Sequence, residues 1–217
     1  MKELIKKSIH FLVIFLLFTT LTTTLIYVNG KIDLQLIANR YHVAFLDCFF
    51  FYFTKIIESP VLLIFALIFL FKNAKYGIIG ILTYAIVGGI ASLLKLYVFG
   101  NALRPTSLIK GLRLIPEHFE LEQLSSLSFP SGHTTAGFTI FLVLTLIVKN
   151  KNWGYFFGIC AVLVAYSRVY LSQHFFEDIL AGGIIGVFGT LIVFYLLDKI
   201  KFGDWAQKPL IRYLNKK

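Results

Sequence analysis

Charged residues are scarce in this chain. Asp, Glu, Lys and Arg together make up 15% of its 217 residues, whereas hydrophobic residues make up 58%. Soluble domains usually carry about a quarter charged residues, and a chain of this length could not hide so much apolar surface from water. The composition therefore excludes an ordinary soluble domain. It predicts an integral membrane protein, and the length suits a single domain.

Cysteine is nearly absent, which removes another class of protein. Cys48 and Cys160 are the two cysteines. Because Cys160 falls inside an apolar run, neither a disulfide framework nor redox chemistry is expected. The sequence also has no carboxylate cluster of the kind that a magnesium site uses, and no internal repeat. It therefore predicts neither a metal nor another cofactor.

Apolar runs are what the chain has in abundance. A helix needs roughly 20 apolar residues to cross a bilayer. The candidate runs are about Phe11–Val28, Ile57–Phe71, Tyr76–Phe99, Thr134–Val148, Trp153–Leu171 and Ile179–Leu197. The second and fourth are short and need their flanking residues to complete a span. The first has basic flanks like a signal peptide, but it is long and lacks a small-residue cleavage site, which favours a retained anchor. We predict an all-α, polytopic membrane protein with about six transmembrane helices in one bundle.

Basic residues set the predicted orientation. If the amino terminus is cytoplasmic, thirteen Lys and Arg residues fall on the inner side and eight on the outer side, which favours both termini inside. Much of the net charge of +10 sits in the same cytoplasmic flanks, where attraction to anionic lipid headgroups is expected. Membrane lipids are therefore expected partners and nucleic acid is not. The basic cytoplasmic tail at about 199–217 is expected on the membrane surface or in solvent.

Two segments on the predicted outer side stand out. Residues of about 31–57 mix polar and apolar positions in a pattern that suits a helix lying in the membrane interface. Residues 100–129 form the longest connection, and long loops in compact domains are often functional. This loop is either a partly buried flap beside a lipid entrance or a plain tether between two spans.

Three short stretches place ionisable residues at the ends of apolar runs. They are Lys95 with Arg104-Pro105, then Pro130-Ser131-Gly132-His133, and Ser167-Arg168 with His174 and Asp178. Ionisable groups are costly at membrane depth, which favours a functional role. With the amino terminus inside, all three stretches fall on the outer side. They can therefore form one site.

The residue types in these stretches suit a phosphate ester. His174 and Asp178 are four apart, so on a helix they share a face and can hydrogen-bond. A carboxylate on one ring nitrogen leaves the other nitrogen as a nucleophile. Ser131 is a favoured N-cap residue, a helix start there would attract an anion, and Gly132 allows close approach to the backbone. The cations suited to phosphate oxygens are Lys95, Arg104 and Arg168.

At these residues the sequence resembles the type 2 phosphatidic acid phosphatase (PAP2) family of membrane lipid phosphatases. The family pattern is Lys, a spacer and Arg-Pro; then Pro-Ser-Gly-His; then Ser-Arg, five residues, His, three residues and Asp. The second and third stretches match at every specified position. The first departs, because eight residues separate Lys95 from Arg104 where the family has six. The turn at Gly100-Asn101 would have to absorb the two extra residues.

The resemblance implies one PAP2-like transmembrane domain over residues 1–217, with a motif-bearing core at about 76–197. It also implies the role of each catalytic residue. His174 attacks phosphorus to form a phosphohistidine, Asp178 orients His174, and His133 protonates the leaving oxygen and then activates water. The residues implied to bind the substrate phosphate are Lys95, Arg104, Arg168, Ser131 and Gly132.

The implied reaction is metal-independent hydrolysis of a lipid phosphomonoester or diphosphate at the periplasmic face of a bacterial cytoplasmic membrane. Candidate substrates are undecaprenyl diphosphate, phosphatidic acid or phosphatidylglycerol phosphate, and lipid A phosphate. A lipid phosphotransferase of the same family is the first alternative, and an anion transporter, a bis-histidine haem protein and a vanadium haloperoxidase are others. The remaining histidines are interpreted as packing residues: His10, His42 and His118.

Overall fold

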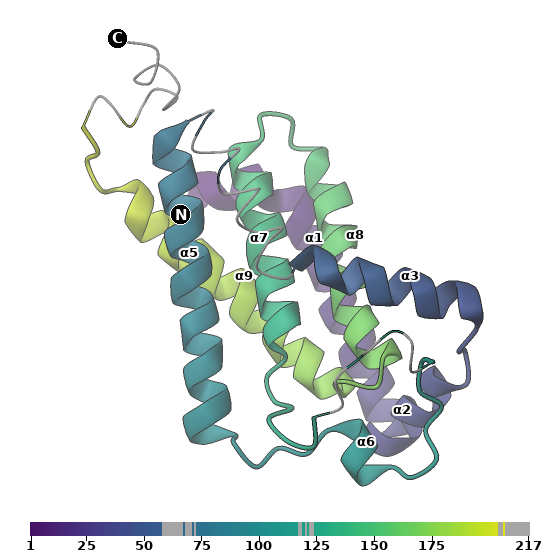
Figure 1. The fold of residues 1–217 in the computed structure, drawn as a ribbon. Helices are drawn as coiled ribbons and strands as arrows, with labels where there is room; N and C mark the ends of the chain where they lie inside the picture. The colour runs from purple at the N-terminus through teal and green to yellow at the C-terminus, as the bar shows by residue number, and fades with distance from the viewer. Residues whose placement is uncertain are drawn as a thin grey trace.

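The computed structural model describes residues 1–57, 67, 71, 73–116, 119, 121, 124–203 and 206, and in these ranges the chain is helical without a strand. The α-helices are α1 (Lys2–Asn29), α2 (Lys31–Asn39), α3 (Ala44–Thr54), α5 (Ala74–Leu93), α6 (Pro105–Leu108), α7 (Gly132–Ile147), α8 (Trp153–Tyr170) and α9 (Phe176–Asp198). A 3₁₀ turn at Lys55–Ile57 follows α3, and a π-helical turn at Leu94–Val98 extends α5. The long helices form one bundle (Figure 1). The all-α prediction is confirmed.

Four of the described helices are long and apolar enough to cross a membrane. They are α1, α5 with its π turn, α8 and α9. Helix α7 is also apolar but has 16 residues, which gives a length of about 24 Å. These five helices lie where five of the six apolar runs predicted them. The run at about Ile57–Phe71 lies largely outside the described residues, so a count of six spans stays a prediction.

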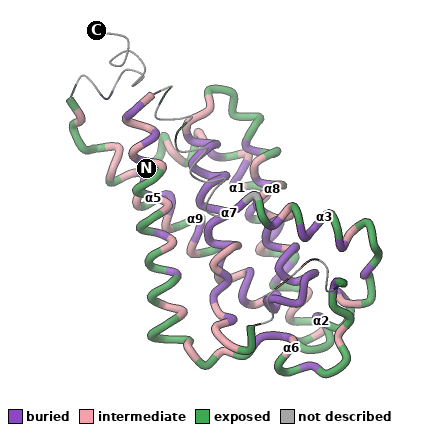
Figure 2. The backbone as a smooth tube through the Cα atoms, viewed as in Figure 1, coloured by how far each residue is buried: buried purple, intermediate pink, exposed green. Residues whose placement is uncertain are grey.

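Helix α7 occupies the centre of the bundle. Its residues Thr134–Leu146 are all buried, as the purple tube in Figure 2 shows. A helix that is apolar on every side is stable only when other helices surround it, and α5, α8, α9 and α1 all pack against α7. Phe138 of α7 makes aromatic contacts with Phe11, Phe15 and Phe18 of α1. The amino-terminal helix is therefore part of the core.

A glycine brings α9 against the first turn of α7. A Cβ atom on Gly182 would lie 2.6 Å from the carbonyl oxygen of Ser131 and 3.1 Å from the side chain of Thr134. Glycine has no Cβ, so the two backbones can approach closely here. The amide of Ser131 also donates to the carbonyl of Asp178 at 3.0 Å. This contact sets the start of α7 beside the start of α9.

The segment predicted as one interfacial helix is two helices, α2 and α3, so that prediction was wrong in one respect. The chain leaves helical geometry near Arg40 and re-enters it after Val43, which has extended dihedral angles. In this break His42 turns inward, and its Nδ1 lies 2.9 Å from Oδ1 of Asp47. The Tyr170 hydroxyl donates to the same oxygen at 2.6 Å. Contacts with α8 therefore override the local helical pattern.

The connection from α5 to α7 begins with the π turn. A π turn takes one residue more than an α turn, and this one carries Lys95 at the start of the longer spacer to Arg104. The expected turn at Gly100-Asn101 is present as well. The described part of the loop is bonded to the bundle: Asn39 Nδ2 donates to the carbonyl of Arg113 at 2.8 Å, and the Arg113 amide donates to Asn39 Oδ1 at 2.9 Å. The acidic residues Glu117, Glu120 and Glu122 lie outside the described residues.

Candidate active site

The three stretches meet at one end of the bundle. This is the end where α5 and α8 finish and α7 and α9 begin, at the bottom of the view in Figure 1. Hydrogen bonds join the stretches directly: Arg104 donates to Gln173, and Ser131 donates to the carbonyl of Asp178. The three stretches are therefore neighbours in the fold.

His174 lies in the short link between α8 and α9, and Asp178 is in the first turn of α9. Nδ1 of His174 lies 3.3 Å from Oδ2 of Asp178, and both side chains are 2% exposed. Burial lowers the pKa of His174 to about 3, against an opposing contribution from Asp178. The imidazole is therefore neutral at physiological pH, which is the state that a nucleophile requires.

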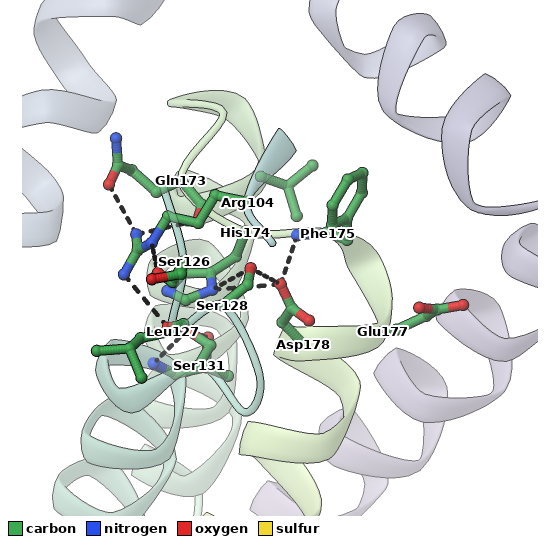
Figure 3. A network of polar contacts seen from close by, with 12 residues as sticks. Arg104, Ser126, Leu127, Ser128, Ser131, Gln173, His174, Phe175, Glu177 and Asp178 are labelled. Atoms are coloured by element: carbon green, nitrogen blue, oxygen red, sulfur yellow. Dashed lines mark hydrogen bonds and ion pairs between the residues drawn. The ribbon is translucent and has the colours of Figure 1, made fainter. Parts of the chain in front are cut away.

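Asp178 Oδ2 has two further donors. The Ser128 hydroxyl donates to it at 2.5 Å, and the backbone amide of Phe175 donates at 2.8 Å (Figure 3). The second of these satisfies an amide at the start of α9, where helix N–H groups lack an acceptor within the helix. One carboxylate thus caps α9 and holds His174. It binds the loop before α7 through Ser128 as well.

Arg104 is buried at 6% exposure. Its Nη1 donates to the backbone carbonyl of Gln173 at 3.1 Å and to the side-chain Oε1 of the same residue at 2.9 Å. Its Nε donates to the carbonyl of Ser126 at 3.0 Å, and Nη2 lies 3.5 Å from the carbonyl of Leu127. The guanidinium therefore ties the segment before α7 to the segment that carries His174 (Figure 3).

Arg168 is in the last turn of α8 and is also 6% exposed. Its Nη1 donates to Oγ1 of Thr54, the last residue of α3, at 3.1 Å. The carbonyl of Arg168 accepts from the amides of Gln173 and His174, at 2.9 and 3.1 Å. Backbone hydrogen bonds thus hold the link that carries His174 against Arg168, whose side chain is positively charged.

Ser131 is the N-cap of α7, as predicted. Its Oγ accepts from the Thr134 amide at 3.4 Å and from the Thr134 hydroxyl at 3.0 Å. The Ser131 side chain is fully buried, so its observed contacts stabilise the helix start. Gly132 and His133 follow as the first two helical residues and are half-buried. Helix N–H groups at this position point at the site and attract anions.

His133 and Lys95 complete the cluster. The His133 imidazole lies within electrostatic range of Arg168, His174, Lys95 and Arg104. Half-buried Lys95, on the π turn, interacts in the same way with Arg104, Arg168 and Asp178. The residues predicted from the three stretches are therefore brought together, Lys95 included. Three cations and two imidazoles share one buried region.

Two cavities reach this region. One, of about 590 Å³, lies between α5 and α7 and is lined by Gly132, His133 and Ala136 together with Tyr84, Gly88 and Ser92. The other, of about 390 Å³, touches Asp178 and is lined by apolar residues of the α5–α7 connection, Phe99, Ala102, Leu103, Leu108 and Phe129. Both have apolar walls that end at ionisable groups. That combination suits a molecule with an apolar chain and a charged head.

Three polar contacts of the site were not foreseen from the sequence. They come from Ser128 on Asp178, Gln173 on Arg104 and Thr54 on Arg168. These contacts join residues 50, 69 and 114 positions apart, so no local spacing could have pointed to them. Among the described residues, no group of three or more His, Cys, Asp and Glu side chains is placed to hold a metal ion.

Comparison with known proteins agrees with this geometry. Residues 76–202 match the model of the PAP2 superfamily. The chain is 36% identical over 124 residues to phosphatidylglycerophosphatase B of Bacillus subtilis, covering 50% of this chain and 59% of that protein. It is 32% identical over 123 residues to an undecaprenyl-diphosphatase of Sulfolobus acidocaldarius, covering 56% of this chain and 55% of that protein. The chain thus spans somewhat more than half the length of these relatives.

A solved structure extends the likeness to the fold. The crystal structure of Aquifex aeolicus LpxE superposes with a TM-score of 0.68 at 25% identity, covering 76% of this chain and 94% of that chain. The sequence match covers all three ionisable stretches, and the bundle places those stretches together. This multi-pass membrane protein belongs to the PAP2 superfamily.

Proposed function

We propose that this protein is a lipid phosphatase that hydrolyses a phosphomonoester or diphosphate of a lipid through a phosphohistidine intermediate. The observation that carries the proposal is a buried His174 that is bonded through Nδ1 to Asp178 and lies near Arg104 and Arg168, with Lys95 near both arginines. Relatives named as lipid phosphate phosphatases support the same class of substrate.

The first half of the reaction transfers the phosphoryl group to the enzyme. With Nδ1 held by Asp178, the lone pair of Nε2 of His174 attacks phosphorus, and the bond from phosphorus to the lipid oxygen breaks. Protonated His133 gives its proton to that oxygen. The leaving group is therefore the lipid alcohol, or the protonated lipid monophosphate if the substrate is a diphosphate. The cations offset charge on the phosphoryl oxygens, which is the main requirement in phosphoryl transfer.

The second half regenerates the enzyme. His133, now without the proton, takes one from water as the water oxygen attacks the phosphohistidine. The bond from phosphorus to Nε2 breaks, inorganic phosphate leaves, and both imidazoles return to their starting states. Asp178 stabilises the positive charge that develops on His174 while the phosphorus–nitrogen bond exists.

The direct test is phosphate release by the purified protein from lipid phosphates in detergent micelles or liposomes. A panel should include phosphatidic acid, phosphatidylglycerol phosphate, undecaprenyl diphosphate and lipid A phosphate, with lipid products followed by mass spectrometry. We expect release from at least one of them, and a phosphohistidine on His174 trapped by acid-free quenching. Activity that survives in both His174→Ala and His133→Ala would refute the assignment.

We further propose that the site faces the periplasm of a bacterial inner membrane, with both termini in the cytoplasm. The charge bias of the loops supports this orientation. Exposed Lys110 lies in the α5–α7 connection, at the site's end of the bundle, and exposed Lys151 lies between α7 and α8, at the other end. With Cys48 and Cys160 replaced, a membrane-impermeant maleimide on intact cells should label Lys110→Cys and spare Lys151→Cys. The reverse pattern contradicts the orientation.

A further inference from the structure

We propose that Gln173 is a positioning residue that orients the Arg104 guanidinium beside His174 while leaving its positive charge undiminished. This inference rests on the proposed phosphatase function and adds a residue at a position of the third stretch that the family pattern leaves unspecified. Gln173 is 2% exposed and directly precedes His174 in the chain. Its side chain therefore points into the protein at the place where the nucleophile is held.

Gln173 bridges the two arginines of the site. Its backbone amide donates to the carbonyl of Arg168 at 2.9 Å, and its own carbonyl accepts from Nη1 of Arg104 at 3.1 Å. Its side-chain Oε1 accepts from the same Nη1 at 2.9 Å (Figure 3). The main-chain bonds are available to any residue at this position, whereas the Oε1 contact depends on the side chain.

The contact fixes the plane of a group whose direction matters. A guanidinium donates in one plane, so the direction in which Nη2 of Arg104 can donate to a phosphate oxygen depends on how that plane is turned. Gln173 Oε1 and the carbonyl of Ser126 hold the group through Nη1 and Nε. Rotation about the last bonds of Arg104 is therefore restricted before any substrate arrives, which saves the cost of ordering it in the transition state.

A neutral acceptor is the suitable choice for this task. Glutamate has the same length and would bond the guanidinium more strongly, but its negative charge would offset the positive potential felt by a phosphoryl group nearby. An amide oxygen orients the cation without cancelling its charge. A Gln173→Glu substitution therefore has two opposite effects: it strengthens the contact with Arg104, and it lowers the positive potential at the phosphate.

The test compares Gln173→Glu and Gln173→Met with the wild type, using three measurements on purified full-length protein. These are kcat and KM for a hydrolysed lipid phosphate, inhibition by orthovanadate, and the thermal unfolding midpoint in detergent. Orthovanadate is the probe because it takes the five-coordinate geometry of phosphorus in transfer. Gln35→Met is the matched control, since Gln35 is also fully buried and its Nε2 donates to the carbonyl of Val169.

For Gln173→Glu we expect an unfolding midpoint at or above that of the wild type, with kcat lowered about 100-fold and orthovanadate inhibition weakened by a similar factor. For Gln173→Met we expect kcat to fall about tenfold with little change in KM, because the cation keeps its charge but loses its orientation. Gln35→Met should lose as much thermal stability as Gln173→Met while its kcat stays within about twofold of the wild type.

Two results overturn the proposal. One is a folded Gln173→Glu protein whose kcat and orthovanadate inhibition match the wild type. The other, which decides the matter if Gln173→Glu does not fold, is a parallel loss of kcat and stability in Gln173→Met and Gln35→Met. A wild-type protein that hydrolyses no lipid phosphate sinks the proposed function itself, whereas an active wild type with an unaffected Gln173→Glu variant sinks this inference alone.

Discussion

Two buried histidine–carboxylate pairs lie at the end of α8, and their difference shows what makes such a pair catalytic. His42 and Asp47 are 2.9 Å apart and His174 and Asp178 are 3.3 Å apart, and all four side chains are at most 4% exposed. By distance alone the first pair is the better candidate, and the two pairs are about equally buried. The two pairs differ in their neighbours.

His42 is held by an aromatic ring and a carboxyl group. Its ring stacks on Tyr170 with centroids 4.3 Å apart, and the Tyr170 hydroxyl shares the Asp47 oxygen. The Val43 amide donates to that hydroxyl at 3.2 Å. This arrangement fastens the α2–α3 turn to α8. Among the described residues, no hydrogen bond or ion pair joins His42 or Asp47 to a Lys or Arg side chain.

His174, by contrast, lies within electrostatic range of Arg168 and Arg104, and of His133 as well. Like charges repel one another, so a site that gathers Arg104 and Arg168 beside a neutral imidazole suits the binding of an anion. A histidine–carboxylate pair is a structural clamp in one setting and an oriented nucleophile in the other. The surrounding charge decides which.

The largest expected difference between the pairs concerns the histidines themselves. His174→Ala should lower kcat by about 10⁴-fold or more, because the nucleophile is lost and the remaining groups act as one unit with it. His42→Ala should leave kcat within about threefold of the wild type but lower the thermal unfolding midpoint, since Asp47 loses a partner while buried. Phosphate release and calorimetry on both variants measure this. Equal losses of activity would erase the distinction.

The carboxylates should differ next most. Asp178→Asn should lower kcat by roughly 10²- to 10⁴-fold, because the amide no longer enforces the tautomer and orientation of His174. Asp47→Asn should cost about 1–3 kcal/mol of unfolding free energy through imperfectly satisfied buried donors, with kcat little changed. Steady-state kinetics with denaturant titration separates the two effects. A catalytic loss in Asp47→Asn would assign the α2–α3 clamp a direct role.

A smaller effect is expected at the hydroxyl that accompanies each carboxylate. Ser128→Ala removes a donor at 2.5 Å from Asp178, and Tyr170→Phe removes one at 2.6 Å from Asp47. Each should cost about 0.5–1.5 kcal/mol of stability or slightly more. We expect Ser128→Ala also to lower kcat by about tenfold, and Tyr170→Phe to leave it unchanged. If Ser128→Ala has full activity, Ser128 serves folding alone.

The smallest effect expected is on the pH dependence of stability. The pKa of His174 is about 3 in the folded protein and about 6.5 in an unfolded chain, so the unfolded state binds the extra proton between these values. The contribution of neutral His174 is therefore complete above about pH 6.5 and is lost progressively as the pH falls toward 3.

Thermal unfolding between pH 7 and pH 5 checks this sign. The midpoint of the wild type should fall more steeply than that of His174→Gln, which has the same polarity without a titratable ring. Parallel curves for the two proteins would show that His174 takes up its proton as readily when folded as when unfolded.

Much of the architecture was predictable because membrane helices depend on local properties. Hydropathy placed α1, α5, α7, α8 and α9, since each apolar run must satisfy its backbone hydrogen bonds within itself. The break between α2 and α3 was missed for the opposite reason. It depends on His42 turning toward Tyr170, which is 128 positions away in the chain.

The candidate site was likewise predictable only where its contacts are local in sequence. The pairing of His174 with Asp178 follows from a spacing of four residues, and the N-cap role of Ser131 follows from the residue type and the proline before it. Ser128, Gln173 and Thr54 carry no such signal, because each contacts a partner at least 50 positions distant. The place of Lys95 in the cluster, despite its longer spacer, was uncertain from the sequence, which gave no sign of the π turn that carries Lys95.

The sequence by itself determined the membrane setting, the helical class and the chemical inventory of the site, because hydropathy and short-range spacing act within one segment of chain. The tertiary structure alone decided that His42 pairs with a buried carboxyl group of its own, and which neutral side chains contact Asp178 and the two arginines. Those outcomes depend on how helices far apart in sequence pack, and close approaches such as that of Gly182 to Ser131 are set by three-dimensional fit.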